Sequence, residues 1–200
     1  MKNAFQQRSH EDVVDLIAAS PLALMVSTCS EGFHMTPLPM LADTDAEGSL
    51  VRLVGHMALR NPQVAVLQRH PRAHFLFLGP HGYVSPALLS DRTRAPTWNY
   101  AVARVEADVH FQPDNNDAAL RRLVTRLEDG KPDAWSVEEM GARYEQLAGH
   151  VIAFDAEVRE VEATFKLGQD ERPDVFRDIL AGLGSSELTR WMERFDQRED

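Results

Sequence analysis

Between residues 22 and 111 the chain consists largely of short apolar runs separated by turn-forming residues. These runs cover residues 22–29, 32–41, 49–57, 72–79 and 97–111, with Gly, Pro, Asp or Ser between them. Runs of this length and punctuation are typical of β-strands joined by short connections. In the last run Ala101, Ala103 and Val105 alternate with more polar neighbours, which indicates a half-buried strand. The sequence therefore predicts a mostly antiparallel sheet or a small barrel.

Segments with helical spacing flank and interrupt these strands. Ser9 with Asp12 forms a capping pair for a first helix, and Asn61 with Pro62 opens a short helix that ends before Pro71. Four more helices are expected: one capped by Asp114 and Asp117 and ending before Gly130, one from a Ser136–Glu139 capping box through Leu147, one at residues 173–182, and one from Ser186 through Phe195. Residues 150–167 return to strand, with a bulge near Glu160 and Val161.

The charge of the chain weighs against nucleic acid as a partner. Lysine and arginine number 21 against 31 aspartate and glutamate, which gives a formal net charge of -10. Such a charge repels phosphates unless a local basic patch overrides it. No apolar run approaches the ~20 residues of a membrane span, and the N-terminus lacks the apolar segment of a secretory signal. With one cysteine, Cys29, and thus no internal disulfide, we expect a cytoplasmic protein with no membrane association.

Signatures of metal, nucleophile and phosphate-loop chemistry are weak in this sequence. His70 and His74 are four residues apart, but Pro71 between them opposes a shared helical face, so no metal site is predicted. Cys29 lacks a recognisable catalytic motif and is interpreted as a small buried thiol. There is no P-loop and no G-x-G-x-x-G motif, and residues 79–82 are interpreted as a turn.

Three segments combine apolar surface with small polar groups. They are residues 35–39, residues 55–62 and residues 97–100, the last reading Thr-Trp-Asn-Tyr. A flavin needs such a mixture, because its ring is a broad aromatic plate with a polar edge and its phosphate seeks N–H groups, hydroxyls or a cation. Ordinary packing of barrel strands would account for the same composition, so both interpretations stay open at this point.

Several motifs occur in an order that resembles one known family. These motifs are GHMALRNPQ, FLGPHGYVSP, PTWNYAVARV, GHVIAFDAEV and FKLGQD. Their order and spacing are similar to those of the PaiB-like family, called FMN-binding negative transcriptional regulators. The resemblance extends from Pro21 to about Leu183, which is most of the chain.

The resemblance implies a fold, a cofactor and a site. The implied fold is α+β, a mostly antiparallel split β-barrel related to pyridoxamine-phosphate oxidases and flavin reductases, with peripheral helices. It would occupy residues 1–184, and residues 185–200 would form an amphipathic C-terminal helix that packs on the barrel or on a partner subunit. Such barrels usually work as homodimers with FMN at the subunit interface. The residues implied to bind FMN are Thr36, Pro37, Leu38, Gly55, His56, Ala58, Asn61, Trp98, Asn99, Tyr100, Lys166 and Gln169.

Four residues, in three segments, depart from the family pattern. Leu88 and Leu89 stand near where the family usually has Trp-Tyr, Val64 replaces a tryptophan, and Gly168 replaces a common serine. The family label implies a transcriptional repressor, with DNA as a partner, although no helix-turn-helix motif is evident. Two alternatives are a flavin-dependent oxidoreductase, for which His56 and Tyr100 are the first acid–base candidates, and a structural barrel without flavin.

Overall fold

One antiparallel sheet organises the molecule. The computed structural model describes residues 4–30, 32–196 and 198. Its seven strands are hydrogen-bonded in the order β2-β1-β5-β6-β7-β4-β3. Their bounds are β1 Leu22–Cys29, β2 Gly32–Pro39, β3 Leu41–Thr44, β4 Leu50–Ala58, β5 Arg72–Val84, β6 Thr97–Phe111 and β7 Val151–Lys166. The predicted α+β class with a mostly antiparallel sheet is confirmed.

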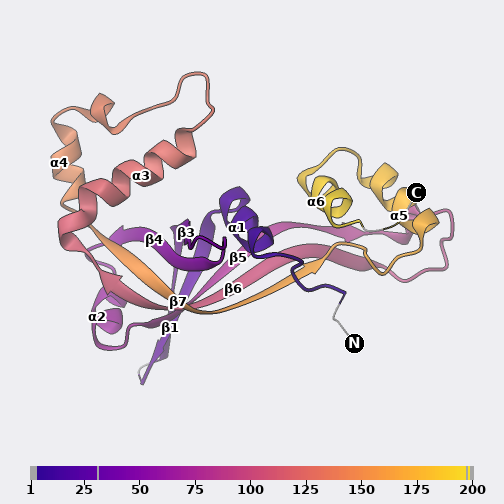
Figure 1. The fold of residues 1–200 in the computed structure, drawn as a ribbon, viewed down its shortest axis with the longest axis horizontal. Coiled ribbons are helices and arrows are strands. Elements are labelled where there is room, and N and C mark those ends of the chain that lie inside the picture. Colours follow the sequence, from indigo (N-terminus) through magenta and orange to yellow (C-terminus); the bar gives the residue numbers. More distant parts are fainter. Residues whose placement is uncertain (1–3, 31, 197, 199–200) are drawn as a thin grey trace.

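The three longest strands, β5, β6 and β7, run most of the length of the molecule, and helices cluster at both of their ends (Figure 1). The helices are α1 His10–Ala19, α2 Pro62–Arg69, α3 Asn116–Glu128, α4 Arg143–Ala148, α5 Pro173–Leu183 and α6 Glu187–Phe195, with short 3-10 turns at Pro86–Leu88, Pro113–Asn115 and Val137–Met140. In Figure 1, α3 and α4 lie at the left end and α5 and α6 at the right end. No helix of the described residues is long and apolar enough to cross a bilayer.

One part of the hydrophobic core forms where α1 lies against β3, β4, β5 and β6. Ser9 and Asp12 form the predicted capping box of α1, which orients its buried side chains Leu16 and Ile17 toward the sheet. The rings of Phe75 and Phe154 stack 6.4 Å apart within this core. Burial of such apolar groups is the main favourable contribution to folding.

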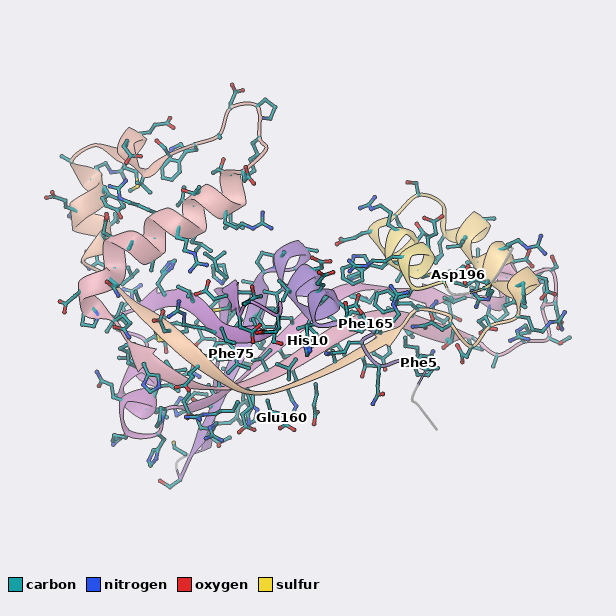
Figure 2. All side chains as sticks on the ribbon, viewed as in Figure 1. Phe5, His10, Phe75, Glu160, Phe165 and Asp196 are labelled. Atoms are coloured by element: carbon teal, nitrogen blue, oxygen red, sulfur yellow. The ribbon has the colours of Figure 1, made fainter. Side chains whose placement is uncertain are left out.

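A second part of the core joins the C-terminal helix α6 to the end of β7. Phe165, near the end of β7, stacks on Trp191 and Phe195 of α6, with ring centroids 5.9 Å and 4.7 Å away. Figure 2 shows Phe165 on the strand beneath the C-terminal helices and Phe75 near the opposite end of the sheet. The apolar face of α6 is thereby buried on the same chain.

Two sequence-based predictions about local structure are wrong. Residues 79–82 are not a free turn: they lie inside β5, whose pairing with β6 shifts register between Leu78 and His81. A bulge of this kind absorbs Gly and Pro while the strand continues. Asp114 does not cap a helix, because Pro113–Asn115 form a 3-10 turn and α3 begins only at Asn116.

Other local predictions are confirmed, one with a difference in helix type. The capping box of Ser136 and Glu139 is present, but it opens the 3-10 turn Val137–Met140, and α4 follows separately. The bulge expected near Glu160 lies at Arg159, because Glu106 pairs with Glu160 while Ala107 pairs with Val158. Both terminal helices begin close to their predicted starts at Pro173 and Ser186.

One face of the sheet, formed by strands β2, β1, β5 and β6, has no helix over its apolar side chains; we call it the open face. Strand pairing places Leu24 opposite Leu76, Leu78 opposite Val102, and Tyr83 opposite Trp98, so these side chains point to the same side. The large apolar residues exposed on it are Leu22, Phe33, Met35, Leu76, Leu78, Tyr83 and Trp98, with exposed fractions between 41% and 69%.

Candidate functional site

The structure divides the predicted flavin residues into two groups. The first group lies around β2, β4 and the start of α2 and contains Thr36, Pro37, Leu38, Gly55, His56, Ala58 and Asn61. The second group lies where β6 begins and β7 ends and contains Trp98, Asn99, Tyr100, Lys166 and Gln169.

A hydrogen-bond network links Thr36 and Asn61 in the first group. The Asn61 side chain caps α2 by accepting from Gln63 N at 2.9 Å, and its Nδ2 donates to Thr36 Oγ1 at 3.0 Å. Thr36 Oγ1 in turn donates to Gln63 Oε1 at 2.6 Å. Because the single hydroxyl proton of Thr36 is used inside the protein, this hydroxyl retains only acceptor capacity for a ligand.

Gln63 is a site residue that sequence reasoning missed. It is almost fully buried, and its Nε2 donates to Ser27 Oγ at 2.9 Å. Its Oε1 accepts from Thr36 Oγ1 and its Nε2 also donates to His34 O at 3.4 Å, so Gln63 ties β1, β2 and α2 together. In the sequence, Gln63 directly follows the helix start at Asn61-Pro62. A glutamine at such a position is usually exposed, so the sequence did not predict a buried site residue there.

Gly55 and His56 sit side by side on β4 but have different surroundings. A Cβ at Gly55 would lie 2.7 Å from Met40 Sδ and 3.1 Å from Phe154 Cζ. A side chain at Gly55 would therefore force Met40 to move, whatever the role of Gly55 toward a ligand. Nδ1 of His56 is buried and has no hydrogen-bond partner among the described residues. Burial lowers the pKa of His56 below its ordinary value, so the ring is held in the neutral form.

Pro37, Leu38 and Ala58 complete the first group. Leu38 is buried in the core, whereas Pro37 and Ala58 are exposed. Pro37 pairs with Leu24 and lies on the open face, while Ala58 is at the end of β4 opposite Val151. Of these three, Pro37 and Ala58 have surface free for a ligand.

An aromatic cluster forms the second group on the open face. The Trp98 ring lies 5.8 Å from the His81 ring and 6.1 Å from the Tyr83 ring, measured between centroids. Tyr100 follows on the same side of β6, opposite His81. His81 and Tyr83 were not predicted as site residues, because their segment had been interpreted as a turn rather than as strand beside β6.

Polar side chains in the second group differ in their freedom to bind a ligand. Lys166 Nζ donates to Trp98 O at 2.9 Å and also to Thr97 Oγ1, which leaves one of its three N–H groups. Gln169 uses both its amide oxygen and its amide nitrogen in the turn after β7, since it accepts from Leu167 N and donates to Phe165 O. Asn99 is buried and directs its Nδ2 toward Met192 Sδ at 3.6 Å.

The two groups are too far apart to hold one ligand within a single chain. Gly55 pairs with Phe154 near the start of β7, whereas Tyr100 pairs with Lys166 at its end. Twelve residues of strand separate those two positions, which corresponds to about 40 Å at the usual rise per residue. Asn99 and Gln169 are further set apart from the exposed residues by their own burial and internal bonds.

The positions that depart from the family pattern are filled by packing contacts. Val64 lies on α2 and is buried in the core, and Leu89 is buried as well. Leu88 lies so close to Gly182 of α5 that a Cβ there would be 2.8 Å from it. Gly168 has a φ of +84°, a conformation that glycine adopts without strain, and so it suits the turn after β7 better than serine would.

The side-chain atoms that remain available in the first and second groups are, taken together, chemically suited to bind FMN. Lys166 offers a cationic N–H for a phosphate, and Trp98 and Tyr100 offer aromatic surface. At the first group, His56 has a buried ring nitrogen without a partner among the described residues. These are the kinds of contact that a phosphorylated aromatic ring with a polar edge requires.

Comparison with known proteins identifies the family. Residues 1–160 match the family model described as "Putative FMN-binding domain". The chain is 24% identical over 199 residues to "Protease synthase and sporulation protein PAI 2" of Bacillus subtilis, covering 98% of this chain and 94% of that protein. An uncharacterized yeast protein, YKL070W, is 25% identical over 46% of this chain and 59% of its own length.

Solved structures share the fold at low sequence identity. The FAD and heme binding protein from Mycobacterium smegmatis superposes with a TM-score of 0.62 at 19% identity, covering 88% of this chain and 80% of that one. The flavocytochrome Anf3 from Azotobacter vinelandii gives 0.61 at 15% identity, covering 80% and 69%. The split-barrel prediction is confirmed by these likenesses, and FMN as cofactor is confirmed at the level of the family. The chain belongs to the PaiB-like family of FMN-binding split-barrel proteins.

Proposed function

We propose that the protein is a homodimer that binds FMN in two equivalent sites, each built from the first group of one subunit and the second group of the other. The observation that carries this proposal is the separation of about 40 Å between the groups, which follows from the twelve residues of β7 between them. In a two-fold dimer whose axis passes midway between the two groups, the first group of one subunit would lie opposite the second group of the other.

The open face supplies the surface for that dimer. It combines exposed apolar residues with a charged strip in which Arg104 pairs with Glu162 at 2.8 Å. An exposed apolar patch rimmed by polar residues is typical of a protein–protein interface. Pro37 of the first group and Trp98 of the second both lie on this face, so contact between two open faces would carry both groups into the seam.

Within such a site each free side chain has a role. Lys166 binds the phosphate through its remaining N–H, Trp98 and Tyr100 pack on the ring, and the exposed Pro37 and Ala58 cover it from the other subunit. His56 provides a nitrogen for the polar edge of the ring. Bound FMN would supply one- or two-electron redox chemistry that this chain lacks by itself.

We propose that the FMN-binding protein has a regulatory function. The name of the Bacillus relative associates that protein with protease synthesis and sporulation, and we extend a regulatory role to this chain by analogy. The net charge of -10 opposes direct DNA binding, and we therefore propose that regulation acts through a partner or through the flavin state. A promoter-fragment shift assay at low salt would give no complex; a specific complex would contradict this part of the proposal.

Subunit complementation tests the shared site. We expect that His56→Ala and Lys166→Ala each lose FMN on gel filtration, followed by flavin absorbance. Mixed dimers of the two variants should regain about half of the wild-type flavin content, because one of their two sites combines an intact first group with an intact second group. Lys131→Ala, which removes an exposed lysine paired only with Glu128, serves as the control.

Two outcomes would contradict the proposal. Mixed dimers that remain free of flavin would mean that each site lies within one subunit. Unchanged FMN content in both single variants, with dimers intact, would mean that the site has been placed wrongly. Oxidation of a pyridine nucleotide by the FMN-loaded protein would favour the oxidoreductase alternative over a regulatory role.

A further inference from the structure

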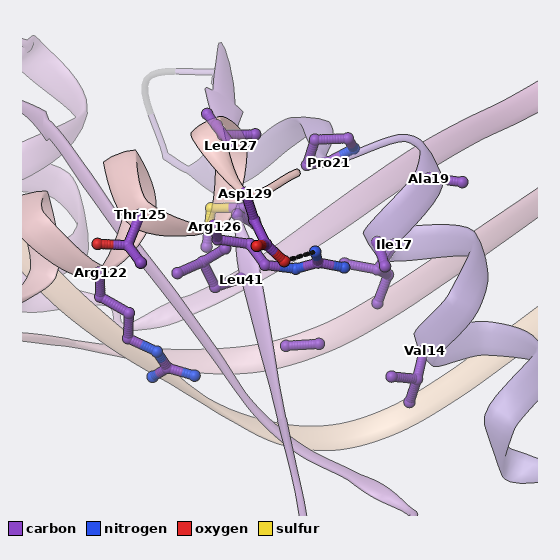
Figure 3. Close-up of a pocket in the computed structure, with 13 residues that line it drawn as sticks. Val14, Ile17, Ala19, Pro21, Leu41, Arg122, Thr125, Arg126, Leu127 and Asp129 are labelled. Carbon is purple, nitrogen blue, oxygen red and sulfur yellow. Dashed lines mark ion pairs between the residues drawn. The ribbon is translucent and has the colours of Figure 1, made fainter. Parts of the chain in front are cut away.

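A cavity of about 840 Å³ lies between α1, β3 and α3, and the residues that line it do not include any member of the two groups of flavin residues. Figure 3 shows its lining, with α1 on one side and α3 on the other. Its floor and walls are aliphatic and come mainly from Val14, Ile17, Pro21, Met40, Leu41 and Leu127. No aromatic side chain lines this cavity. A volume of this size is within the range of pockets that bind small molecules.

A second hollow, of about 420 Å³, adjoins the first and has the opposite character. The two share Ala18, Ala19 and Arg126, so they meet at the end of α1. The second hollow adds Arg190 and Arg194 of α6, with Asp15 as its acidic lining residue. Together the hollows form one groove, which we call the α1 groove, with an aliphatic end and an arginine-rich end.

The arginines of the α1 groove are not equally free. Arg122 is tied to Asp43: burial acts against the charge of Asp43, but hydrogen bonds from Arg122 and Arg52 outweigh it and hold its pKa below the usual value. Arg194 binds Asp12 at 3.1 Å and Asp15 at 2.7 Å. These two guanidinium groups are therefore largely neutralised by carboxylates of the same chain.

Arg126 and Arg190 keep most of their capacity to bind an anion. Arg126 reaches Asp129 only at 4.0 Å, and both side chains are mostly exposed, so this ion pair is weak. Figure 3 shows this pair among the residues that line the cavity. The Arg190 side chain has no ion pair or hydrogen bond within the part of the chain that the structure describes. The chain has a net charge of -10, but these two guanidinium groups place positive charge beside the aliphatic cavity.

We propose that the α1 groove binds an amphiphilic carboxylate, with an aliphatic tail between α1 and α3 and its carboxylate on Arg126 and Arg190. Guanidinium groups form strong, charge-assisted hydrogen bonds to carboxylates, and the tail displaces water from aliphatic surface. On binding, Arg126 exchanges the distant carboxylate of Asp129 for that of the ligand. Among the described residues, the aliphatic end of the groove has no aromatic side chain on which a flavin ring could stack.

Calorimetric titration of the FMN-loaded protein with sodium decanoate tests this inference. We expect saturable binding of one decanoate per subunit that weakens with added salt. Neither 1-decanol, which lacks the charge, nor acetate, which lacks the tail, should bind comparably. FMN content should stay unchanged throughout, which separates this site from the flavin site. The same titration on flavin-free protein keeps the inference testable if the proposed flavin site is wrong.

Charge variants supply the decisive comparison. Arg126→Gln should weaken decanoate binding about tenfold, since a hydrogen-bonded charge is lost. Asp129→Asn should strengthen it several-fold, because it removes the carboxylate that competes for Arg126. A gain in affinity does not arise from misfolding. Arg69→Gln on α2, where the side chain bonds only to Ala65 O, is the matched control and should bind as the wild type does.

Three results would overturn the inference. The first is no heat of binding with decanoate in either the FMN-loaded or the flavin-free protein. The second is equal binding of 1-decanol, which would show that the arginines take no part. The third is displacement of decanoate by free FMN in the flavin-free protein, which would assign the groove to the flavin itself.

Discussion

At the scale of single residues, the buried nitrogen of His56 has the clearest consequence. Its Nδ1 has no partner among the described residues, and burial lowers the pKa of the ring. Protonation of His56 in the folded state therefore costs more than in the unfolded chain. The unfolded state binds the extra proton below its ordinary pKa, so the stability that neutral His56 confers is complete above about pH 6.5 and is lost as pH falls from there toward the folded-state pKa.

We predict that the free energy of unfolding of wild type falls as the pH decreases below about 6.5, with a slope from this residue of at most about 1.4 kcal/mol per pH unit. His56→Gln should flatten that slope, measured by urea denaturation of flavin-free protein at several pH values. His70→Gln, at an exposed position after α2, should keep the wild-type slope. A wild-type slope in His56→Gln would show that another group titrates.

Sequence reasoning selected His56 and Gly55 through a family motif, and their physical surroundings could not be read from it. Gly55 is constrained by Met40 and Phe154, which are remote in the sequence and meet it only in the folded sheet. Gln63 was overlooked for the same reason, since its partners Ser27 and Thr36 lie on other elements. Local patterns predict residue types at a site, whereas partners across the fold decide which atoms remain free.

At the scale of elements, α6 is held both by aromatic stacking and by the ion pairs of Arg194 with Asp12 and Asp15. Its side chains Trp191 and Phe195 stack on Phe165 of β7, and Ser186 caps its start by accepting from Thr189 N. The helical spacing of its apolar residues and its capping serine predicted this element closely, because both signals are local. The proposed boundary between a barrel at residues 1–184 and a separate C-terminal helix stays a prediction.

Phe195→Ala should lower the free energy of unfolding by about 3–5 kcal/mol, because it removes a fully buried ring from the stack and leaves a cavity. Chemical denaturation monitored by circular dichroism measures this change. Glu193→Ala, at an exposed position on the same helix, should change stability by less than about 0.5 kcal/mol. A small loss for Phe195→Ala would mean that α6 contributes little to the fold.

Strand lengths were harder to predict than helix positions. The sequence predicted a strand at residues 72–79, yet β5 extends to Val84 through Gly79 and Pro80. The register shift opposite β6 allows that continuation, and it depends on a neighbouring strand rather than on local propensity. This extension brings His81 and Tyr83 beside Trp98 and so creates the aromatic cluster.

At the scale of the whole molecule, the open face is the feature that a single chain leaves unexplained. Its apolar residues come from four strands, so no single sequence segment reveals it. The split-barrel fold and the family were predictable from several ordered motifs. The division of the site into two remote groups was not predictable in the same way, because it depends on the lengths of β6 and β7 and on how the strands pair.

Leu78→Glu should convert the proposed dimer to a folded monomer, because it places a charge in the centre of the open face opposite Val102. Analytical ultracentrifugation at micromolar concentration measures the change, and the monomer should also lose FMN. Leu147→Glu, at an exposed apolar position on α4 outside the open face, should leave the dimer intact. A Leu78→Glu dimer with full flavin content would place the interface elsewhere.

Strand β7 runs continuously between the two ends of the subunit and so fixes the distance between them. Val151 and Lys166 belong to one hydrogen-bonded strand with a single bulge at Arg159, so neither end can shift along the sheet without the other. Inserting one residue into β7 would turn every later side chain to the opposite face of the sheet. Inserting two residues would keep each side chain on its face but lengthen the strand by about 7 Å. In the proposed two-fold dimer, each subunit would contribute one end of β7 to each of the two sites, so the length of β7 would set the spacing between the sites.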